Sequence, residues 1–271
     1  MNGNPFDLSG RVAVVTGGYG VLGGSMADGL AAAGARVAIL GRRREAAIAK
    51  VEQLRGRGHH AIALDADVLD EGDLHRARAE LMEAWGRIDI VINAAGGNVQ
   101  RSRTDGKSIF EMPFDAFDEV VRLNLHGTVY PTLVFGEAMA SRRQGSIVNI
   151  SSMASSQALS GVMGYSAAKA AVENFTRWMA VDLARRFGDR VRVNAIAPGF
   201  FIAEQNRAVL VAPDGSYTER ARTIIARTPM GRFGAHAELN GAVQWLCSDA
   251  ASFVTGVVIP IDGGFSAFSG V

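Results

Sequence analysis

The chain has 271 residues, which is enough for one large α/β domain with a sizeable core. A formal net charge of +1, without a long basic or acidic run, lacks the charge footprint of a nucleic-acid-binding protein. The N-terminal stretch MNGNPFDLSGR holds no apolar signal segment, and no apolar run approaches the roughly 20 residues of a membrane span. The single cysteine, Cys247, excludes an internal disulfide and fits a reducing compartment. We therefore expect a cytoplasmic protein without nucleic-acid or membrane partners.

Short β-branched runs alternate with longer helical patterns along the sequence. The predicted strands cover residues 11–16, 36–40, 61–68, 88–93, 145–151, 190–198 and 256–262. The predicted helices cover about residues 22–34, 44–56, 71–85, 114–140, 162–187 and 236–248. This alternation predicts a single Rossmann-like domain, a doubly wound parallel sheet of about seven strands with helices on both faces. The connections 96–113 and 199–234 are too long for plain turns, which indicates functional loops.

A glycine-rich stretch, VVTGGYGVLGGSMA, follows the first strand and opens the first helix. Glycine at such a turn lets backbone N–H groups approach a pyrophosphate at the helix N-terminus. Because the turn follows the first strand of a βαβ unit, cofactor binding is favoured over an ordinary glycine turn. The predicted contacts are Gly17, Gly18, Tyr19, Gly20, Val21 and Leu22.

The second strand ends in Gly41 and is followed by three arginines, with no carboxylate before Glu45. An acidic residue at this point binds the 2′-hydroxyl of NAD, whereas an arginine accommodates the 2′-phosphate of NADP. The pattern favours NADP over NAD, with Arg42 and Arg43 as contacts. A solvated basic helix start is the alternative, although basic residues disfavour a helix N-terminus.

Tyr165 and Lys169 lie four residues apart in the stretch GYSAAKAAVENF, among small residues. This spacing places both on one face of a helix, where an ammonium would lower the phenol pKa from about 10. Tyr165 would then donate and accept the proton of a carbonyl/alcohol pair. Ser152 ends the preceding strand and can hydrogen-bond the reacting oxygen. Asn124 stands inside a helix, where asparagine is disfavoured without a reason such as holding a water against Lys169.

These segments together resemble the short-chain dehydrogenase/reductase family over essentially the full length. The matching stretches are TGGYGVLG, DADV, NAAG, NLHG, SS with YSAAK, RVNAIAPG and FVTGVVIPIDGGF. The resemblance implies a catalytic tetrad of Asn124, Ser152, Tyr165 and Lys169, with Lys169 also binding the nicotinamide ribose. It further implies cofactor contacts at Asp67, Val68, Asn93, Ala94, Ala95, Gly96, Pro198, Gly199 and Phe200. The family pattern T-G-x-x-x-G-x-G departs at one position, because Val21 replaces the middle glycine.

The resemblance also implies a homotetramer in which the helices near 114–140 and 162–187 pair across a two-fold axis. The second of these carries apolar side chains on more than one face, notably Phe175, Trp178 and Leu183.

Residues 199–234 are expected to form a lid over the substrate. The run EQNR, the stretch GSYTER and the ending GGFSAFSGV resemble a narrower group within the family, the oxidoreductases that interconvert D-mannonate and D-fructuronate. Gln205 and Asn206 can hydrogen-bond sugar hydroxyls, and Arg207 can grip a carboxylate bidentately. Asn98, Arg101 and His126 are further polar candidates for the substrate site.

Other functions stay open at this point. The protein could reduce another polyol or keto acid, as gluconate 5-dehydrogenases or 3-oxoacyl reductases do, or bind a dinucleotide without turnover. The complete set of proton-transfer residues argues against the last reading. No metal site is predicted, and a lid with few apolar anchors is expected to be mobile when empty.

Overall fold

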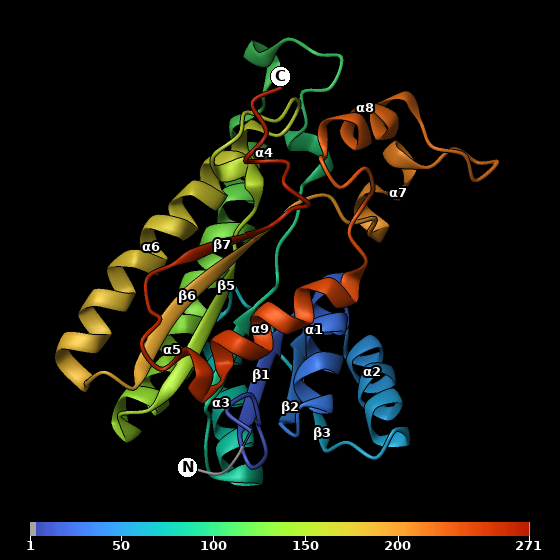
Figure 1. Cartoon of the computed structure of the whole chain (residues 1–271). Helices are drawn as coiled ribbons and strands as arrows, with labels where there is room; N and C mark the ends of the chain where they lie inside the picture. The colour runs from blue at the N-terminus through green and yellow to red at the C-terminus, as the bar shows by residue number, and fades with distance from the viewer. Residues whose placement is uncertain (1–3, 271) are drawn as a thin grey trace.

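The protein is built on a parallel β-sheet. A computed structural model describes residues 4–270, and seven strands run in the order β3-β2-β1-β4-β5-β6-β7, each parallel to its neighbours (Figure 1). The strands are β1 (Val12–Thr16), β2 (Arg36–Gly41), β3 (Ala61–Asp65), β4 (Ile90–Asn93), β5 (Gly145–Ile150), β6 (Val191–Pro198) and β7 (Val258–Ile261). The strands β1, β4, β5 and β6 are buried along their whole length, because layers of helix cover both faces.

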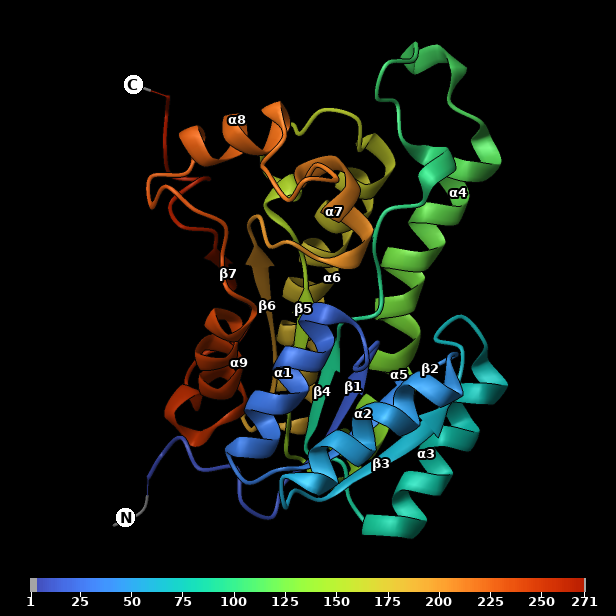
Figure 2. The same ribbon diagram turned by 90° about the vertical axis from the view of Figure 1, so that its right-hand side faces the viewer.

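Helices pack on both faces of this sheet (Figure 2). One apolar cluster joins α1, α2 and α9 to the sheet, and a second joins α3, α5 and α6 to the opposite face. The helices are α1 (Val21–Ala32), α2 (Arg44–Gly56), α3 (Glu71–Trp85), α4 (Phe114–Val121), α5 (Gly127–Arg142), α6 (Met163–Phe187), α7 (Glu204–Leu210), α8 (Glu219–Arg227) and α9 (Asn240–Cys247). The doubly wound Rossmann-like architecture predicted from the sequence is confirmed.

The direction of winding reverses between β1 and β4. β2 and β3 extend the sheet to one side of β1, and the polypeptide then returns to place β4 on the other side, with Thr16 aligned to Asn93. In doubly wound sheets, ligands bind in the crevice outside the carboxyl ends of the strands at such a switch point. This fold therefore positions a site above β1 and β4.

The helix predicted over residues 114–140 is not continuous. A π-helical turn, Arg122–His126, separates α4 from α5. Nδ2 of Asn124 donates to the Val120 carbonyl at 2.8 Å, and Oγ1 of Thr128 donates to the Asn124 carbonyl at 2.9 Å. The Val120 carbonyl is one that a regular helix pairs with the backbone N–H of Asn124, so the Asn124 side chain engages it at the point where the helix widens.

Two other predicted elements differ from the structure by three or more residues at one end. β3 ends at Asp65, so residues 66–68 form a loop rather than the end of a strand. The helix predicted over 236–248 begins as a 3₁₀ turn, His236–Leu239, which passes into α9.

Residues 199–234 contain two short helices, α7 and α8, which lie above the carboxyl ends of the strands (Figure 2). Their apolar side chains gather around Leu210, Ile224 and Phe233 in a cluster separate from the two clusters on the sheet. The expectation that this segment has few apolar anchors was therefore wrong. Its movement on substrate binding stays a prediction.

Candidate active site

The turn after β1 leaves backbone N–H groups open to a ligand. Gly17 adopts φ 62°, a left-handed conformation that favours glycine. A Cβ at Gly23 would lie 2.4 Å from the Gly17 carbonyl oxygen. Helix α1 can therefore pack this closely on the turn only because residue 23 has no side chain. Gly20 is the N-cap of α1, and neither a side-chain cap nor an acidic first-turn residue competes for the first N–H groups. This N-terminus fits the pyrophosphate of a dinucleotide.

Val21 stands where the expected fingerprint has its middle glycine. Its side chain is exposed at the start of α1 and lines the cleft beside the turn. Gly20 has an extended conformation, with φ −73° and ψ 169°. The close packing of helix on turn depends on Gly23, so the change at position 21 leaves the turn intact.

Side chains at the ends of β2 and β3 form the far wall of the cleft. The Arg43 guanidinium lies over the Tyr19 ring, 4.7 Å from its centroid. Arg42 approaches Asp67, with 3.5 Å between Nη1 and Oδ2. Gly41 lets the Tyr19 ring lie close to the backbone here, because a Cβ at position 41 would lie 2.4 Å from that ring. Both arginines are thus placed at the end of β2, where a dinucleotide fold meets the adenosine ribose.

A cleft of about 570 Å³ connects this wall to Tyr165 and Lys169. Most of the predicted cofactor contacts line it. These are Gly17, Tyr19, Gly20, Val21, Leu22, Arg42, Arg43, Asp67, Val68, Ala94, Ala95, Gly96, Tyr165 and Lys169.

The remaining predicted cofactor contacts do not line this cleft. Gly18 packs inward, where a Cβ would lie 2.9 Å from the Val15 carbonyl oxygen. Asn93 is buried toward α5, and its Nδ2 donates to Oγ1 of Thr132 and Oδ1 of Asn149 at 2.8 Å each. Its role here is to join β4 to its neighbours. The segment 198–200 borders an adjoining pocket instead.

Tyr165 lies where the cleft meets that adjoining pocket, which has a volume of about 160 Å³ and is also lined by Ser152. Burial raises the pKa of Tyr165 above its ordinary value of 10.0, and a hydrogen bond with the Ser152 side chain partly opposes the rise. The phenol is therefore protonated at neutral pH, which suits a proton donor to a carbonyl oxygen.

Lys169 is only 4% exposed, and its Nζ donates to the Ile150 carbonyl at 2.7 Å. Burial lowers the pKa of Lys169 to about 8. Nζ lies 5.6 Å from the centroid of the Tyr165 ring. The expected lowering of the Tyr165 pKa by this ammonium was wrong, because desolvation by burial dominates the pKa of both groups.

A carboxylate that the sequence alone did not single out holds the turn that carries Ser152. Glu173, on α6, accepts hydrogen bonds from the hydroxyls of Ser151, at 2.9 Å, and of Ser155. These two serines flank Ser152 along the turn. The only sequence signal was that Glu173 lies four residues beyond Lys169, on the same helix face.

Asn124 is fully buried, and its side chain holds the backbone of Gly97. Oδ1 accepts from the Gly97 N–H at 3.0 Å, and Nδ2 donates to the Gly97 carbonyl at 2.8 Å. Gly97 adopts φ 150°, and a Cβ there would lie 2.3 Å from Oε1 of Gln205 in the lid. Asn124 thus fixes the loop after β4 against the π turn, and its contact with Lys169 through water stays a prediction.

Asn98, Gln205 and Asn206 line the smaller pocket. The amide of Asn206 is committed elsewhere, since Oδ1 accepts from the Ala203 N–H at 2.8 Å and Nδ2 donates to the Phe201 carbonyl at 2.9 Å. Asn206 therefore stabilises the start of α7, and Gln205 is the lid amide with its side chain over the cleft.

Three predicted substrate contacts lie outside this pocket. Arg207 is exposed on α7 and lines neither cavity, so the structure does not support the expectation that it meets a substrate carboxylate. Arg101 pairs with Asp115 at the surface. His126 stacks on Tyr130, with ring centroids 5.2 Å apart.

Two arginines that the sequence alone did not single out line the pocket instead. Arg103 lies in the loop after β4 and Arg220 in the first turn of α8, and both border the cavity that holds Ser152 and Tyr165. Both also pair with the carboxylate of Asp105. From the sequence alone, neither arginine was assigned a role, and only the fold brings the two segments together.

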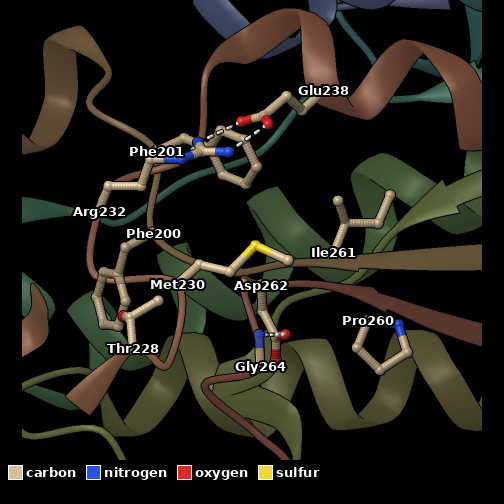
Figure 3. A pocket seen from close by; sticks show the side chains of 12 residues that line it. Phe200, Phe201, Thr228, Met230, Arg232, Glu238, Pro260, Ile261, Asp262 and Gly264 are labelled. Atoms are coloured by element: carbon tan, nitrogen blue, oxygen red, sulfur yellow. Dashed lines mark hydrogen bonds and ion pairs between the residues drawn. The ribbon is translucent and has the colours of Figure 1, made fainter.

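A further cavity of about 340 Å³ lies beside β7 and shares Phe200 and Phe201 with the smaller pocket (Figure 3). Its charged groups are already paired. Arg232 contacts Glu238 at 2.6 Å, and Asp262 accepts from the Gly264 N–H at 2.9 Å. Because Tyr165 does not line this cavity, we assign it no part in the reaction.

Neither a metal site nor a membrane span is found in the described part of the protein. Across residues 4–270, no three His, Cys, Asp or Glu side chains gather where they could hold a metal ion. Within the same range, no helix combines the length and apolar character needed to cross a membrane.

The fold and the site define a dinucleotide-dependent oxidoreductase, with a phosphate turn, a cofactor cleft, and a serine, a tyrosine and a lysine at its inner end. A family model described as enoyl-(acyl carrier protein) reductase matches residues 20–266. UxuB of Bacillus subtilis (strain 168), an uncharacterized oxidoreductase, is 43% identical over 275 residues, which is 98% of both sequences.

Two solved structures are similar over nearly the whole length. A candidate D-mannonate oxidoreductase from Haemophilus influenzae, with bound NAD, is 38% identical with a TM-score of 0.92, and the match covers 98% of both proteins. A gluconate 5-dehydrogenase from Burkholderia cenocepacia J2315, in complex with NADP and tartrate, is 33% identical with a TM-score of 0.88, and the match covers 97% of this protein and 98% of that one. The chain belongs to the short-chain dehydrogenase/reductase family and is an NAD(P)-dependent oxidoreductase.

Proposed function

We propose that the protein interconverts D-mannonate and D-fructuronate, with NADP as its preferred cofactor. The observation that carries the proposal is the lining of the smaller pocket. There, Ser152 and Tyr165 face a cavity that also presents the amides of Asn98 and Gln205 and a cationic wall. A sugar acid offers hydroxyls to the amides and a carboxylate to the wall. The likeness to the Haemophilus influenzae structure supports this substrate class.

The residues of the pocket have distinct parts in the reaction. A bound nicotinamide supplies hydride to the keto carbon or accepts it from the alcohol. Tyr165 gives its phenolic proton to the carbonyl oxygen in the reductive direction and takes it back in the oxidative one. Ser152 hydrogen-bonds the same oxygen and orients it toward Tyr165. Lys169 holds the nicotinamide ribose and, when charged, stabilises the phenolate that forms.

The NADP preference is supported by the arginines at the end of β2. Arg42 and Arg43 line the cleft at the position of the adenosine ribose, and Gly41 leaves no acidic group to bind a 2′-hydroxyl. A 2′-phosphate would gain charge-assisted hydrogen bonds from either guanidinium.

The proposed reaction is tested by following NADPH absorbance with D-fructuronate, and NADP reduction with D-mannonate. We expect turnover with both sugar acids and a higher kcat/KM for the phosphorylated cofactor. Oxidation of NADPH by 5-keto-D-gluconate in preference to D-fructuronate would favour the second candidate, a gluconate 5-dehydrogenase activity. That candidate is supported by the Burkholderia cenocepacia structure.

A homotetramer is part of the same proposal. On α6, Trp178 is 61% exposed and Val181 lies beside it on the surface, while Leu133 is exposed on α5. Three large apolar side chains on these two helices support a partner across them. Light scattering at micromolar concentration should give four times the mass of one protomer, and a monomer would contradict the assembly. The cytoplasmic location likewise stays a proposal, supported by the lone, buried Cys247.

A further inference from the structure

The smaller pocket contains an arginine pair to which the reaction above assigns no role. We propose that Arg220, oriented by Asp105 and backed by Arg103, binds the substrate carboxylate and thereby ties the lid to the substrate. This inference rests on the proposed sugar-acid function and names the group that selects acids over neutral sugars.

Arg103 is firmly committed to Asp105. Its Nε and Nη2 both lie 2.8 Å from Oδ2 of that carboxylate, and its side chain is only 14% exposed. The hydrogen bonds from Arg103 are the largest influence that holds the Asp105 pKa below its ordinary value, so this carboxyl stays ionised. Arg103 and Asp105 therefore form a fixed ion pair at the edge of the pocket.

Arg220 is held more loosely. Its Nη1 lies 3.3 Å from Oδ1 of Asp105 and 3.5 Å from the Ser160 hydroxyl, and its Nη2 lies 3.4 Å from the Ser160 carbonyl. All three contacts are at the long end of hydrogen-bond distances. The side chain is 36% exposed and borders the cavity, so its guanidinium can form shorter bonds with an incoming carboxylate.

The charge of the cluster favours an anion. Two guanidinium groups share one carboxylate, which leaves one positive charge, and no aspartate or glutamate from the described residues lines this pocket. A carboxylate that enters the pocket thus meets an uncompensated cation in a partly desolvated place, where such a pair is stronger than in water.

The support under Arg220 is rigid. Gly161 adopts φ 77°, and a Cβ there would lie 2.6 Å from Oδ1 of Asp105, so only glycine allows this approach. The Thr104 N–H also donates to the Gly161 carbonyl at 3.2 Å. The loop after β4 and the loop before α6 are therefore joined, and together they form a fixed platform for a residue of the lid.

In this arrangement, a residue of the lid contacts the group that distinguishes a sugar acid from a neutral sugar. Arg220 lies on α8, whereas Ser152 and Tyr165 lie on the sheet side of the pocket. A sugar acid bound at its carbonyl by the hydroxyls and at its carboxylate by Arg220 would bridge the two. A neutral ketose lacks the second contact and leaves α8 attached only through Asp105 and Ser160.

The test compares D-fructuronate with D-fructose, which carries a CH₂OH group in place of the carboxylate. In Arg220→Ala we expect kcat/KM for D-fructuronate to fall about 30-fold or more, since truncating one partner of such a charge pair is costly, and kcat/KM for D-fructose to change less than about threefold. Arg220→Lys should recover part of the loss, because it supplies a charge without the planar fork. Arg222→Ala, on the exposed side of the same helix, and Arg207→Ala are matched controls that should behave as the parent.

A binding measurement decides the matter independently of turnover. The Kd of D-mannonate is measured by calorimetry in the Tyr165→Phe background saturated with NADP, with and without Arg220→Ala. The added substitution should weaken D-mannonate binding about 30-fold while the Kd of NADP is unchanged. Equal Kd values for D-mannonate in the two variants, or equal losses for both sugars in the kinetic comparison, would overturn the inference. Failure of the parent protein to use either sugar acid, with turnover of a neutral ketone, would instead overturn the proposed function.

Discussion

The two halves of the active site are held by different kinds of contact. In the cofactor half, the turn after β1 presents backbone groups, and its critical positions are glycines such as Gly17 and Gly23, whose spacing is set locally along the sequence. In the substrate half, the ligand faces side chains, and Arg103 and Arg220 come from segments far apart in the sequence. A local motif can specify the first half, whereas only the assembled fold specifies the second. The following predictions test that difference.

Tyr165 stands at the junction of the two halves. Tyr165→Phe should lower kcat at least about 100-fold, because the proton donor is lost while the ring keeps its packing. The Kd of NADPH, measured by fluorescence, should change little, because the turn after β1 and the arginines beyond it are intact. A near-normal kcat would show that another group supplies the proton.

Lys169 should make the free energy of unfolding depend on pH. Its pKa is lowered from 10.5 to about 8 in the folded protein, so the unfolded state binds more protons between these values. The free energy of unfolding should therefore rise with pH across that window, and the unfavourable effect of the buried amine is fully present below pH 8.

Lys169→Met removes this dependence. Urea unfolding of both proteins is measured at pH 7.5 and at pH 10. Between these pH values, the free energy of unfolding of the parent should rise by about 2 kcal/mol more than that of the variant. The variant should also lose turnover. Parallel pH profiles for the two proteins would mean that the amine is not desolvated.

Gly23→Ala tests the backbone-built half alone. The new Cβ would lie 2.4 Å from the Gly17 carbonyl oxygen, so α1 must move away from the turn. Such overpacking costs about 1–3 kcal/mol, and because it displaces the phosphate turn, NADPH affinity should fall about tenfold. Gly241→Ala is the control, because a Cβ at that helical glycine meets nothing within 4 Å. Normal NADPH affinity in Gly23→Ala would contradict the close packing of the turn.

Arg42 contributes a side chain to the cofactor half of the site. Its removal should therefore weaken the use of NADPH less than Gly23→Ala does. Arg42→Ala should lower kcat/KM for NADPH about fivefold, since its exposure weakens any charge-assisted bond, and should leave NADH use nearly unchanged. Arg44→Ala, from the same basic run but outside the cleft, is the control. An equal loss with both cofactors would place Arg42 away from the 2′-phosphate.

The sequence was sufficient for the fold and for most of the cofactor cleft. Short β-branched runs between helical patterns located the seven strands. Consecutive turn residues such as Tyr19 to Leu22 line the cleft because they follow a strand at the switch point. Asn93 was misplaced because one residue along a strand reverses the face to which a side chain points. The π turn was missed because the helical spacing of apolar residues does not distinguish it from a regular turn.

The substrate contacts were harder to predict for a physical reason. Arg207 and Arg220 both lie in the lid, and both have the right chemistry for a carboxylate. Asn206 bonds to Ala203 and Phe201, which fixes the start of α7 and leaves Arg207 at the surface. Arg220 gains its position from Asp105, a residue of another loop. No spacing rule along the sequence contains that information.

The apolar cluster around Leu210, Ile224 and Phe233 gives the lid a core of its own. Because Leu210 and Ile224 also line the smaller pocket, changes inside that cluster should alter the pocket wall without disturbing the two apolar clusters on the sheet. We infer that the lid can evolve as a separate module. A lineage can retain the machinery for hydride and proton transfer and acquire a new substrate by rewriting α7 and α8, provided that the replacement brings its own small core.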